Sequence, residues 1–203
     1  MFIFISFQGS AGILNNQLNV PYGVSFDLSS RALYIADYVN QRIMCYAYGA
    51  SSGTMVAGTG SGGNSFTQLD GPATVHFDSP TQSLIIVDVV YRRVVRWPLG
   101  ATNWSLIAGD KAGVAGTNAT QLNNPIGITM DPMGNFYVAD YANTRIQLFL
   151  AGQFEGITIA GRTGVPGSNA SLLMYPYSMK LDNQLNLYVA DSGNHRIQRF
   201  LRY

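Results

Sequence analysis

An aspartate that stands five positions before an arginine places an anion and a planar cation within reach of each other. In the segment "YVADYANTRIQLF", residues 137–149, Asp140 and Arg145 hold this spacing among aliphatic and aromatic residues. Such a pair suits either acid–base chemistry at a catalytic site or an ion pair that supports the fold. The same spacing occurs three more times, in the pairs Asp37 and Arg42, Asp88 and Arg93, and Asp191 and Arg196.

The pairs belong to a repeat with a period near 50 residues. Their aspartates follow one another at intervals of 51, 52 and 51 residues, and their arginines keep the same intervals. A proline opens each copy, near positions 21, 72, 125 and 176, and a second aspartate lies six positions after each proline. These second aspartates are Asp27, Asp78, Asp131 and Asp182. A period of this length is typical of propellers and solenoids.

Each copy contains four short segments that predict strands. The segment after the proline, such as "IGITMD" at 126–131, alternates between apolar and polar residues, which indicates a strand with unlike faces. The next, "NFYVAD" at 135–140, is mostly apolar and suits a strand covered on both faces. The segments "RIQLF" at 145–149 and "ITIAG" at 157–161 complete the copy. The sequence therefore predicts an all-β fold of four-stranded antiparallel blades.

The ends of the chain suggest how such blades would close. The segment "IFISFQG" at 3–9 precedes the first proline as "TMVAG" at 54–58 precedes the second, so the chain begins on a fourth strand and ends on a third. The N-terminal strand would then complete the last blade and remove an open edge. We predict one domain over residues 1–203, a propeller of four blades.

The third and fourth copies resemble a known repeat. The segments "PIGITMDPMGNFYVADYANTRIQLF" at 125–149 and "PYSMKLDNQLNLYVADSGNHRIQRF" at 176–200 are similar to the NHL repeat, and the second copy departs from it at Tyr91, where the family has asparagine. The resemblance implies a β-propeller, commonly of six blades, that serves as a platform for recognising proteins or RNA. Related propellers include a metal-dependent lyase. Four copies instead of six leave open that the chain is part of a longer array.

Because a catalytic pair is seldom needed four times in one chain, we interpret the repeated pairs as structural ties. Ligand contacts are expected instead where the copies differ. The polar face of the first strand differs at equivalent positions, which carry Ser25, His76, Thr129 and Lys180. In a propeller these side chains would gather around a central channel, where they would hold an anionic group or order water.

Aromatic residues mark a second candidate surface. Tyr38, Tyr91 and Tyr141 occupy the turns that follow the repeated aspartates. Tyrosine is enriched at protein interfaces because it offers a large contact area at a modest entropy cost. These side chains would therefore either contact a partner or pack between neighbouring blades.

A metal enzyme is the alternative to a binding module. The chain has only two histidines, His76 and His195, at different strand positions, whereas a catalytic zinc usually has three protein ligands. Carboxylates in the channel suit a cation such as calcium, although aspartates that follow a strand ordinarily cap turns. No nucleophile-elbow, phosphate-loop or paired-cysteine motif occurs. We expect no cofactor and keep a lyase or hydrolase with a channel-bound metal ion as the alternative.

Charge and composition limit the classes of partner that the chain is expected to bind. The formal net charge is +1, from twelve basic and eleven acidic residues scattered along the chain, which disfavours nucleic acid. The single cysteine, Cys45, excludes an intrachain disulfide. No segment is long and apolar enough for a membrane span. Glycosylation sequons at Asn103, Asn118 and Asn169 favour a glycoprotein and an extracellular location if the chain is part of a longer secreted protein.

These observations together predict a non-catalytic binding or scaffold module. It would recognise a protein, a peptide or a small ligand through one loop face or the channel mouth.

Overall fold

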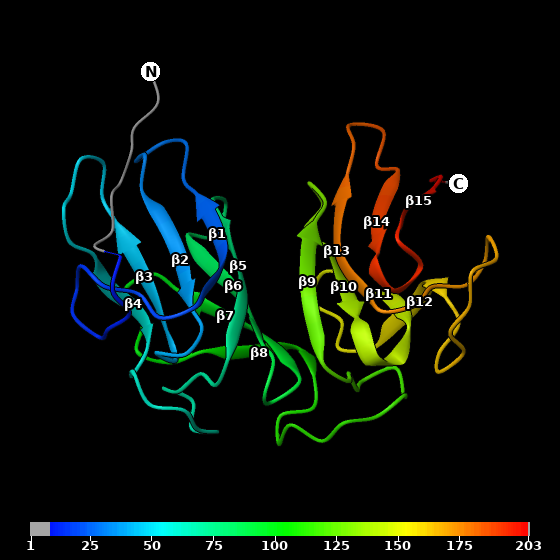
Figure 1. The fold of residues 1–203 in the computed structure, drawn as a ribbon, viewed down its shortest axis with the longest axis horizontal. Helices are drawn as coiled ribbons and strands as arrows, with labels where there is room; N and C mark the ends of the chain where they lie inside the picture. Colours follow the sequence, from blue (N-terminus) through cyan, green and yellow to red (C-terminus); the bar gives the residue numbers. More distant parts are fainter. Residues whose placement is uncertain (1–8, 203) are drawn as a thin grey trace. The chain divides into compact units, whose positions relative to one another are not determined.

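Four antiparallel sheets, one for each sequence copy, make up the computed structural model, which describes residues 9–202 (Figure 1). The first sheet contains β1 (Pro21–Phe26), β2 (Leu33–Asp37), β3 (Arg42–Tyr46) and β4 (Thr54–Gly58). The second contains β5 (Pro72–Asp78), β6 (Ser83–Asp88), β7 (Arg93–Pro98) and β8 (Ser105–Gly109). The third contains β9 (Pro125–Met130), β10 (Phe136–Asp140), β11 (Arg145–Phe149) and β12 (Gly156–Gly161). The fourth contains β13 (Pro176–Leu181), β14 (Leu187–Asp191) and β15 (Arg196–Phe200).

Within every sheet the strands lie side by side in chain order, which is the meander of a propeller blade. The predicted all-β class with four antiparallel blades is therefore confirmed. The predicted closure of the last blade concerns residues 1–8, which lie outside the described residues. The fourth blade accordingly has three described strands.

In the first, third and fourth blades, strand register brings the repeated aspartate opposite its arginine. Asp140 is paired with Arg145 across β10 and β11, and the same register holds for Asp37 with Arg42. The last residue of one strand and the first residue of the next thus face each other across a turn. In the third blade this turn is the short 3₁₀ segment Tyr141–Asn143, and in the fourth it is Ser192–Asn194.

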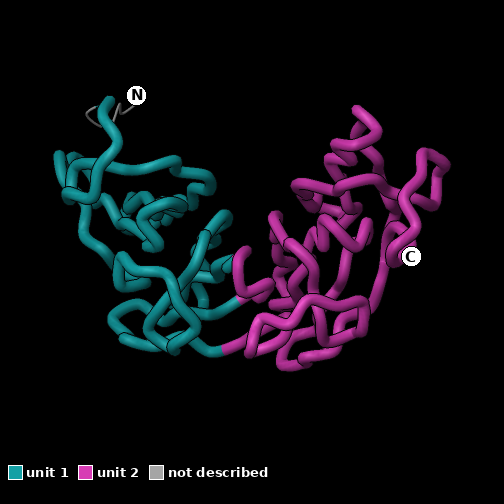
Figure 2. The backbone as a smooth tube through the Cα atoms, turned by 60° about the horizontal axis from the view of Figure 1, so that its bottom comes forward, with its two compact units in different colours: residues 1–88, 95–105 teal, residues 89–94, 106–203 magenta. Residues whose placement is uncertain are grey.

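The chain divides into two compact units (Figure 2). Unit 1 consists of residues 1–88 and 95–105, and unit 2 of residues 89–94 and 106–203. The first sheet lies in unit 1, and the third and fourth sheets lie in unit 2. No helix among residues 9–202 has the length and apolar character needed to cross a membrane.

Each unit buries an apolar layer between successive blades. In unit 1 the rings of Tyr34 on β2 and Phe77 on β5 stack with centroids 5.1 Å apart. In unit 2 a buried cluster joins Ala139 and Ile146 of the third blade to Met179 and Val189 of the fourth. The apolar faces of β5 and β13 thus pack on the preceding blade of the same unit, which explains the alternation seen in these strands.

Candidate binding site

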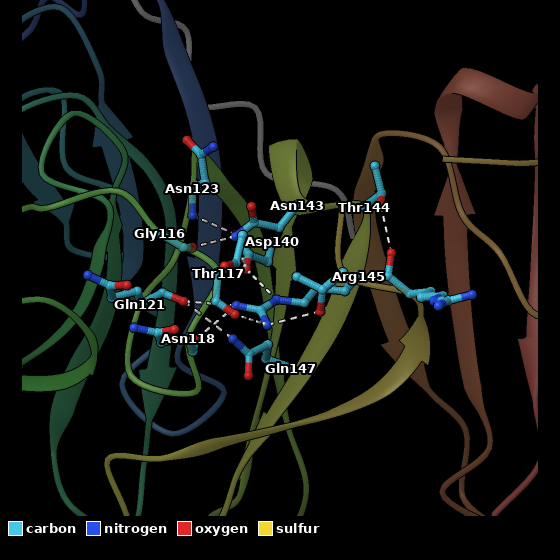
Figure 3. A network of polar contacts seen from close by, with 12 residues as sticks. Gly116, Thr117, Asn118, Gln121, Asn123, Asp140, Asn143, Thr144, Arg145 and Gln147 are labelled. Carbon is cyan, nitrogen blue, oxygen red and sulfur yellow. Dashed lines mark hydrogen bonds and ion pairs between the residues drawn. The ribbon is translucent and has the colours of Figure 1, made fainter. Parts of the chain in front are cut away.

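The repeated aspartate and arginine anchor a buried network at one end of each blade. In the third blade, Asp140 accepts hydrogen bonds from Arg145 Nε and Asn143 Nδ2, both at 2.8 Å, through one carboxylate oxygen (Figure 3). Its other oxygen accepts the backbone N–H of Asn123 at 2.7 Å. The carboxylate therefore ties the turn after β10 to the long loop that enters β9.

The arginine continues the network into the same loop. Arg145 donates from its two terminal nitrogens to the carbonyl oxygens of Thr117, Asn118 and Gln121 at 2.9–3.1 Å (Figure 3). The planar guanidinium is suited to this task because it presents five donors in a fixed geometry. The loop has no regular secondary structure, so its carbonyl groups lack strand partners. The hydrogen bonds from Arg145 satisfy three of them.

The first and fourth blades repeat this network closely. Arg42 Nε lies 2.7 Å from Asp37, and Arg196 Nε lies 2.8 Å from Asp191. In the second blade Asp88 accepts the backbone N–H of Asp70 at 2.9 Å, and Arg93 lies over the ring of Tyr91, 4.8 Å from its centroid. Tyr91, which replaces the usual asparagine, thus contacts the arginine through its ring face.

Burial argues against a catalytic use of these aspartates. The side chain of Asp140 has no solvent exposure, and both of its oxygens accept hydrogen bonds from the protein. Burial raises the pKa of Asp140, while the bonds from Asn123, Asn143 and Arg145 act in the opposite direction. A substrate would have to displace these contacts to reach the carboxylate, so we keep the structural role as our interpretation.

The second aspartates stabilise turns between the first and second strands. Asp131 accepts the N–H groups of Met133 and Asn135, and Asp182 makes the equivalent bonds to Gln184 and Asn186. Asp78 accepts a hydrogen bond from the hydroxyl of Thr81 in its own turn and also bonds Arg96 at 2.8 Å. Among residues 9–202 no three acidic, histidine or cysteine side chains gather in a way that would hold a metal ion. A metal-dependent activity with a channel-bound cation stays the alternative hypothesis.

Asp27 provides a prediction about acid stability. The hydroxyls of Ser30 and Ser29 lower the pKa of this carboxyl from 3.8 to about 2. The folded state therefore favours the charged form of Asp27 more than the unfolded state does. The ionised Asp27 stabilises the fold above pH about 4, and this stabilisation is lost as the pH falls toward 2. We expect Asp27→Asn to flatten this part of the pH profile, measured as the urea midpoint from pH 5 to pH 2. An unchanged profile would contradict this assignment.

The polar residues of the first strands divide between the two units. In unit 1, Ser25 Oγ accepts the backbone N–H of Phe77, one position beyond His76, at 2.9 Å. In unit 2, Thr129 is buried on β9 and Lys180 is exposed on β13. Ser25 thus has a structural bond between strands. The gathering of all four residues at one channel stays a prediction.

Tyrosines form an exposed cluster at the network end of unit 2. The rings of Tyr141 and Tyr175 stack with centroids 5.0 Å apart, and the ring of Tyr177 meets Tyr141 edge-on at 6.3 Å. In unit 1, Tyr22 and Tyr38 make an edge contact at 4.8 Å. The predicted candidates Tyr38 and Tyr141 are therefore held in position by aromatic neighbours, while the rings of Tyr22, Tyr175 and Tyr177 remain substantially exposed.

Backbone conformation before the opening prolines is strained at Tyr175 and Val20. The residue before each opening proline has a positive φ, and Gly71 and Asn124 tolerate this conformation in the second and third copies. Tyr175 adopts it with φ 54°, and Val20 with φ 52°. A bulky residue in this region is strained by about 1 kcal/mol or more. Tyr175, which is 41% exposed, nevertheless stacks its ring on Tyr141.

Sequence reasoning did not identify Tyr175 and Tyr177 as site residues. Alignment of the copies contained one signal, because a tyrosine precedes Pro176 where glycine precedes Pro72 and asparagine precedes Pro125. The stacking on Tyr141 could not be derived, since it joins two blades. His195, the second histidine, lies exposed in a turn, and the sequon residues Asn103, Asn118 and Asn169 are also exposed.

A pocket of about 700 Å³ opens at the opposite end of the strands in unit 2. Its apolar lining includes Leu148, Ile159, Leu187 and Phe200, and Arg202 also lines it. Burial raises the pKa of the Tyr137 hydroxyl, and the positive charge of Arg202 acts in the opposite direction. The pocket lies between the third and fourth blades and has the size of a small-ligand site.

The fold and the repeated network define a protein built from β-propeller blades. The family model of the NHL repeat matches residues 122–149 and 173–200, which are the third and fourth copies. These two copies therefore match the NHL repeat, as the sequence resemblance indicated. No curated protein matches the chain.

Solved structures support the same fold at low identity. They include a protein of unknown function from Bacteroides thetaiotaomicron, at 17% identity and TM-score 0.73, covering 89% of this chain and 47% of that one. A nidogen/laminin complex matches at 20% identity and TM-score 0.68, covering 90% and 60%. A gluconolactonase from Xanthomonas campestris matches at 15% identity and TM-score 0.68, covering 94% and 60%. The chain thus spans about half of the solved structures it matches, and these include both binding proteins and an enzyme.

Proposed function

We propose that the chain is a non-catalytic binding module that recognises a protein or peptide through the tyrosine-bearing end of its blades. The contact surface in unit 2 consists of Tyr141, Tyr175 and Tyr177, defined here as the tyrosine platform. The observation that carries the proposal is the exposed stack of Tyr175 on Tyr141, at a backbone position that is strained for tyrosine and would be relaxed for glycine or asparagine.

The chemistry of the tyrosine platform favours an extended peptide that contains proline or aliphatic side chains. Stacked and edge-on rings offer flat apolar faces, and their hydroxyl groups supply hydrogen-bond donors at the rim. Aromatic-lined surfaces of this kind bind proline-rich segments because such segments lose little entropy on binding. The long loop over residues 162–175 ends at Tyr175 and therefore borders the platform. Ser192 Oγ donates a hydrogen bond to the carbonyl oxygen of Tyr175 and so ties this loop to the turn after β14.

Binding and stability should separate at Tyr175. We expect Tyr175→Asn to leave the free energy of unfolding within about 1 kcal/mol, because relief of the strained backbone offsets the lost ring stacking. Peptide ligands selected from a display library of proline-containing sequences should bind this variant at least about tenfold more weakly, as expected for an interfacial hot spot. Affinity would be measured by fluorescence titration with labelled peptides.

The matched control is Tyr48→Ala, because Tyr48 is about equally exposed but lies outside the tyrosine platform. It should bind the selected peptides as the parent chain does. A library that yields no ligand, or ligands that bind Tyr175→Asn unchanged, would argue against the platform as the binding surface. A large loss of stability in Tyr175→Asn would show that the ring serves packing instead.

A further inference from the structure

An apolar face of the first blade is exposed although its counterparts in the other blades are buried. Val24 on β1 is 64% exposed, whereas the residues at the same repeat position, Val75, Ile128 and Met179, are 2%, 9% and 6% exposed. Phe26 follows the same pattern, since it is largely exposed while Phe77 is buried. We define Val24 and Phe26 as the front face.

The fourth blade shows the converse on its opposite side. Ile197 on β15 is 69% exposed, whereas Ile43, Val94 and Ile146, which hold the same repeat position, have no exposure. Ile197 is paired with Ala190 on β14, so these two residues lie on the same side of the sheet. Tyr188 lies two positions before Ala190 on the same strand and therefore shares that side with Ile197. We define Ile197 and Tyr188 as the back face.

The blades within each unit show how such faces fit together. In unit 2 the back-face position of the third blade, Ile146, shares a buried cluster with Met179, the front-face position of the fourth. In unit 1 Tyr34, equivalent to Tyr188, stacks on Phe77, equivalent to Phe26. The backbone N–H of Phe77 also donates to Ser25 Oγ across the same interface. Each exposed face thus holds one half of a contact that the chain makes elsewhere.

Close backbone approach is part of this recurrent interface. A Cβ atom at Gly23 would lie 2.6 Å from the carbonyl oxygen of Ala73, and one at Gly127 would lie 2.6 Å from that of Tyr177. The first strands of successive blades therefore touch where one of them has glycine. Gly23 thus allows the close approach of β1 to β5 within unit 1.

We propose that the occupant of the front face is the back face of a second copy of this chain, packed head to tail. Val24 and Phe26 of one copy would take the places that Met179 and Phe77 take in the internal interfaces, against Ile197 and Tyr188 of the other. The second copy is favoured because the exposed faces are the two unlike sides of an interface that already recurs in both units. Such a contact is heterologous, so it forms rings or chains according to the rotation between copies.

Complementation of variants tests the proposal. Val24→Asp and Ile197→Asp each place a charge on a residue that is already exposed, so both chains should fold. The parent chain should associate with rising concentration in sedimentation velocity, and each variant alone should stay monomeric up to at least about tenfold higher concentration. An equimolar mixture should form a 1:1 heterodimer, because one intact front face and one intact back face remain.

Val114→Asp is the control, since Val114 is an exposed apolar residue in the loop between β8 and β9. It should associate as the parent chain does. A parent chain that remains monomeric at high concentration would overturn the proposal and assign the two faces to blades of the same polypeptide. Association that survives both substitutions, or a mixture without heterodimer, would equally overturn it by placing the contact elsewhere.

Discussion

Replacing Asp140 by alanine is expected to lower the free energy of unfolding by about 3–5 kcal/mol, because it leaves a buried guanidinium without its anion. The Arg145 side chain is only 3% exposed, and its Nε would lose the partner at 2.8 Å. The backbone N–H of Asn123 and the amide of Asn143 would lose the same carboxylate. Urea unfolding followed by intrinsic fluorescence measures the change.

The fourth blade offers a matched test of the reason for this loss. Asp191 makes the same bonds to Arg196 and Asn194, but the Arg196 side chain is 29% exposed. Water can therefore solvate the stranded guanidinium, and Asp191→Ala should lower stability less than Asp140→Ala does. Glu155→Ala, at an exposed residue of unit 2, should leave stability unchanged. Equal effects of Asp140→Ala and Glu155→Ala would refute the interpretation of the pairs as structural ties.

The repeat made the blades and their ion pairs predictable from the sequence. Four equivalent copies reveal which features serve the frame, because a side chain needed in every blade recurs at a fixed interval. Strand alternation then placed Asp140 at the end of one strand and Arg145 at the start of the next, where antiparallel register pairs them. The loop carbonyl oxygens that accept hydrogen bonds from Arg145 could not be predicted, because the loop sequences differ among the copies.

The candidate binding site was less accessible to sequence reasoning, because it depends on contacts between blades. Tyr141 was identified from its place after the repeated aspartate, but its stacking partner Tyr175 lies on the loop that enters the next blade. Likewise, nothing in the strand pattern distinguishes Val24 from Val75. Their difference arises from what covers each strand, since Val75 is buried and Val24 is exposed, and this is a property of tertiary packing.

Replacing Gly161 by alanine should be among the most damaging single substitutions in unit 2. The residue ends β12 with φ 76°, and an added Cβ would lie 2.3 Å from the carbonyl oxygen of Thr144. Thr144 precedes Arg145, so the clash would displace the strand that carries the buried guanidinium. We expect a loss of about 3 kcal/mol or more, which combines backbone strain with disruption of the network. Thermal and urea unfolding would both report it.

Gly152→Ala separates the two causes of this loss. Gly152 has almost the same backbone angle, φ 77°, but an added Cβ would meet no atom within 4 Å. Its substitution should therefore show the conformational strain alone, about 1 kcal/mol. If Gly161→Ala were no more destabilising than Gly152→Ala, the approach of β12 to Thr144 would be easily relaxed. The larger expected loss follows because Gly58 and Gly109 make equivalent approaches, 2.4 Å from the carbonyl oxygens of Gln41 and Arg92. The close approach therefore belongs to the blade design, and Gly161 has little freedom to move away from it.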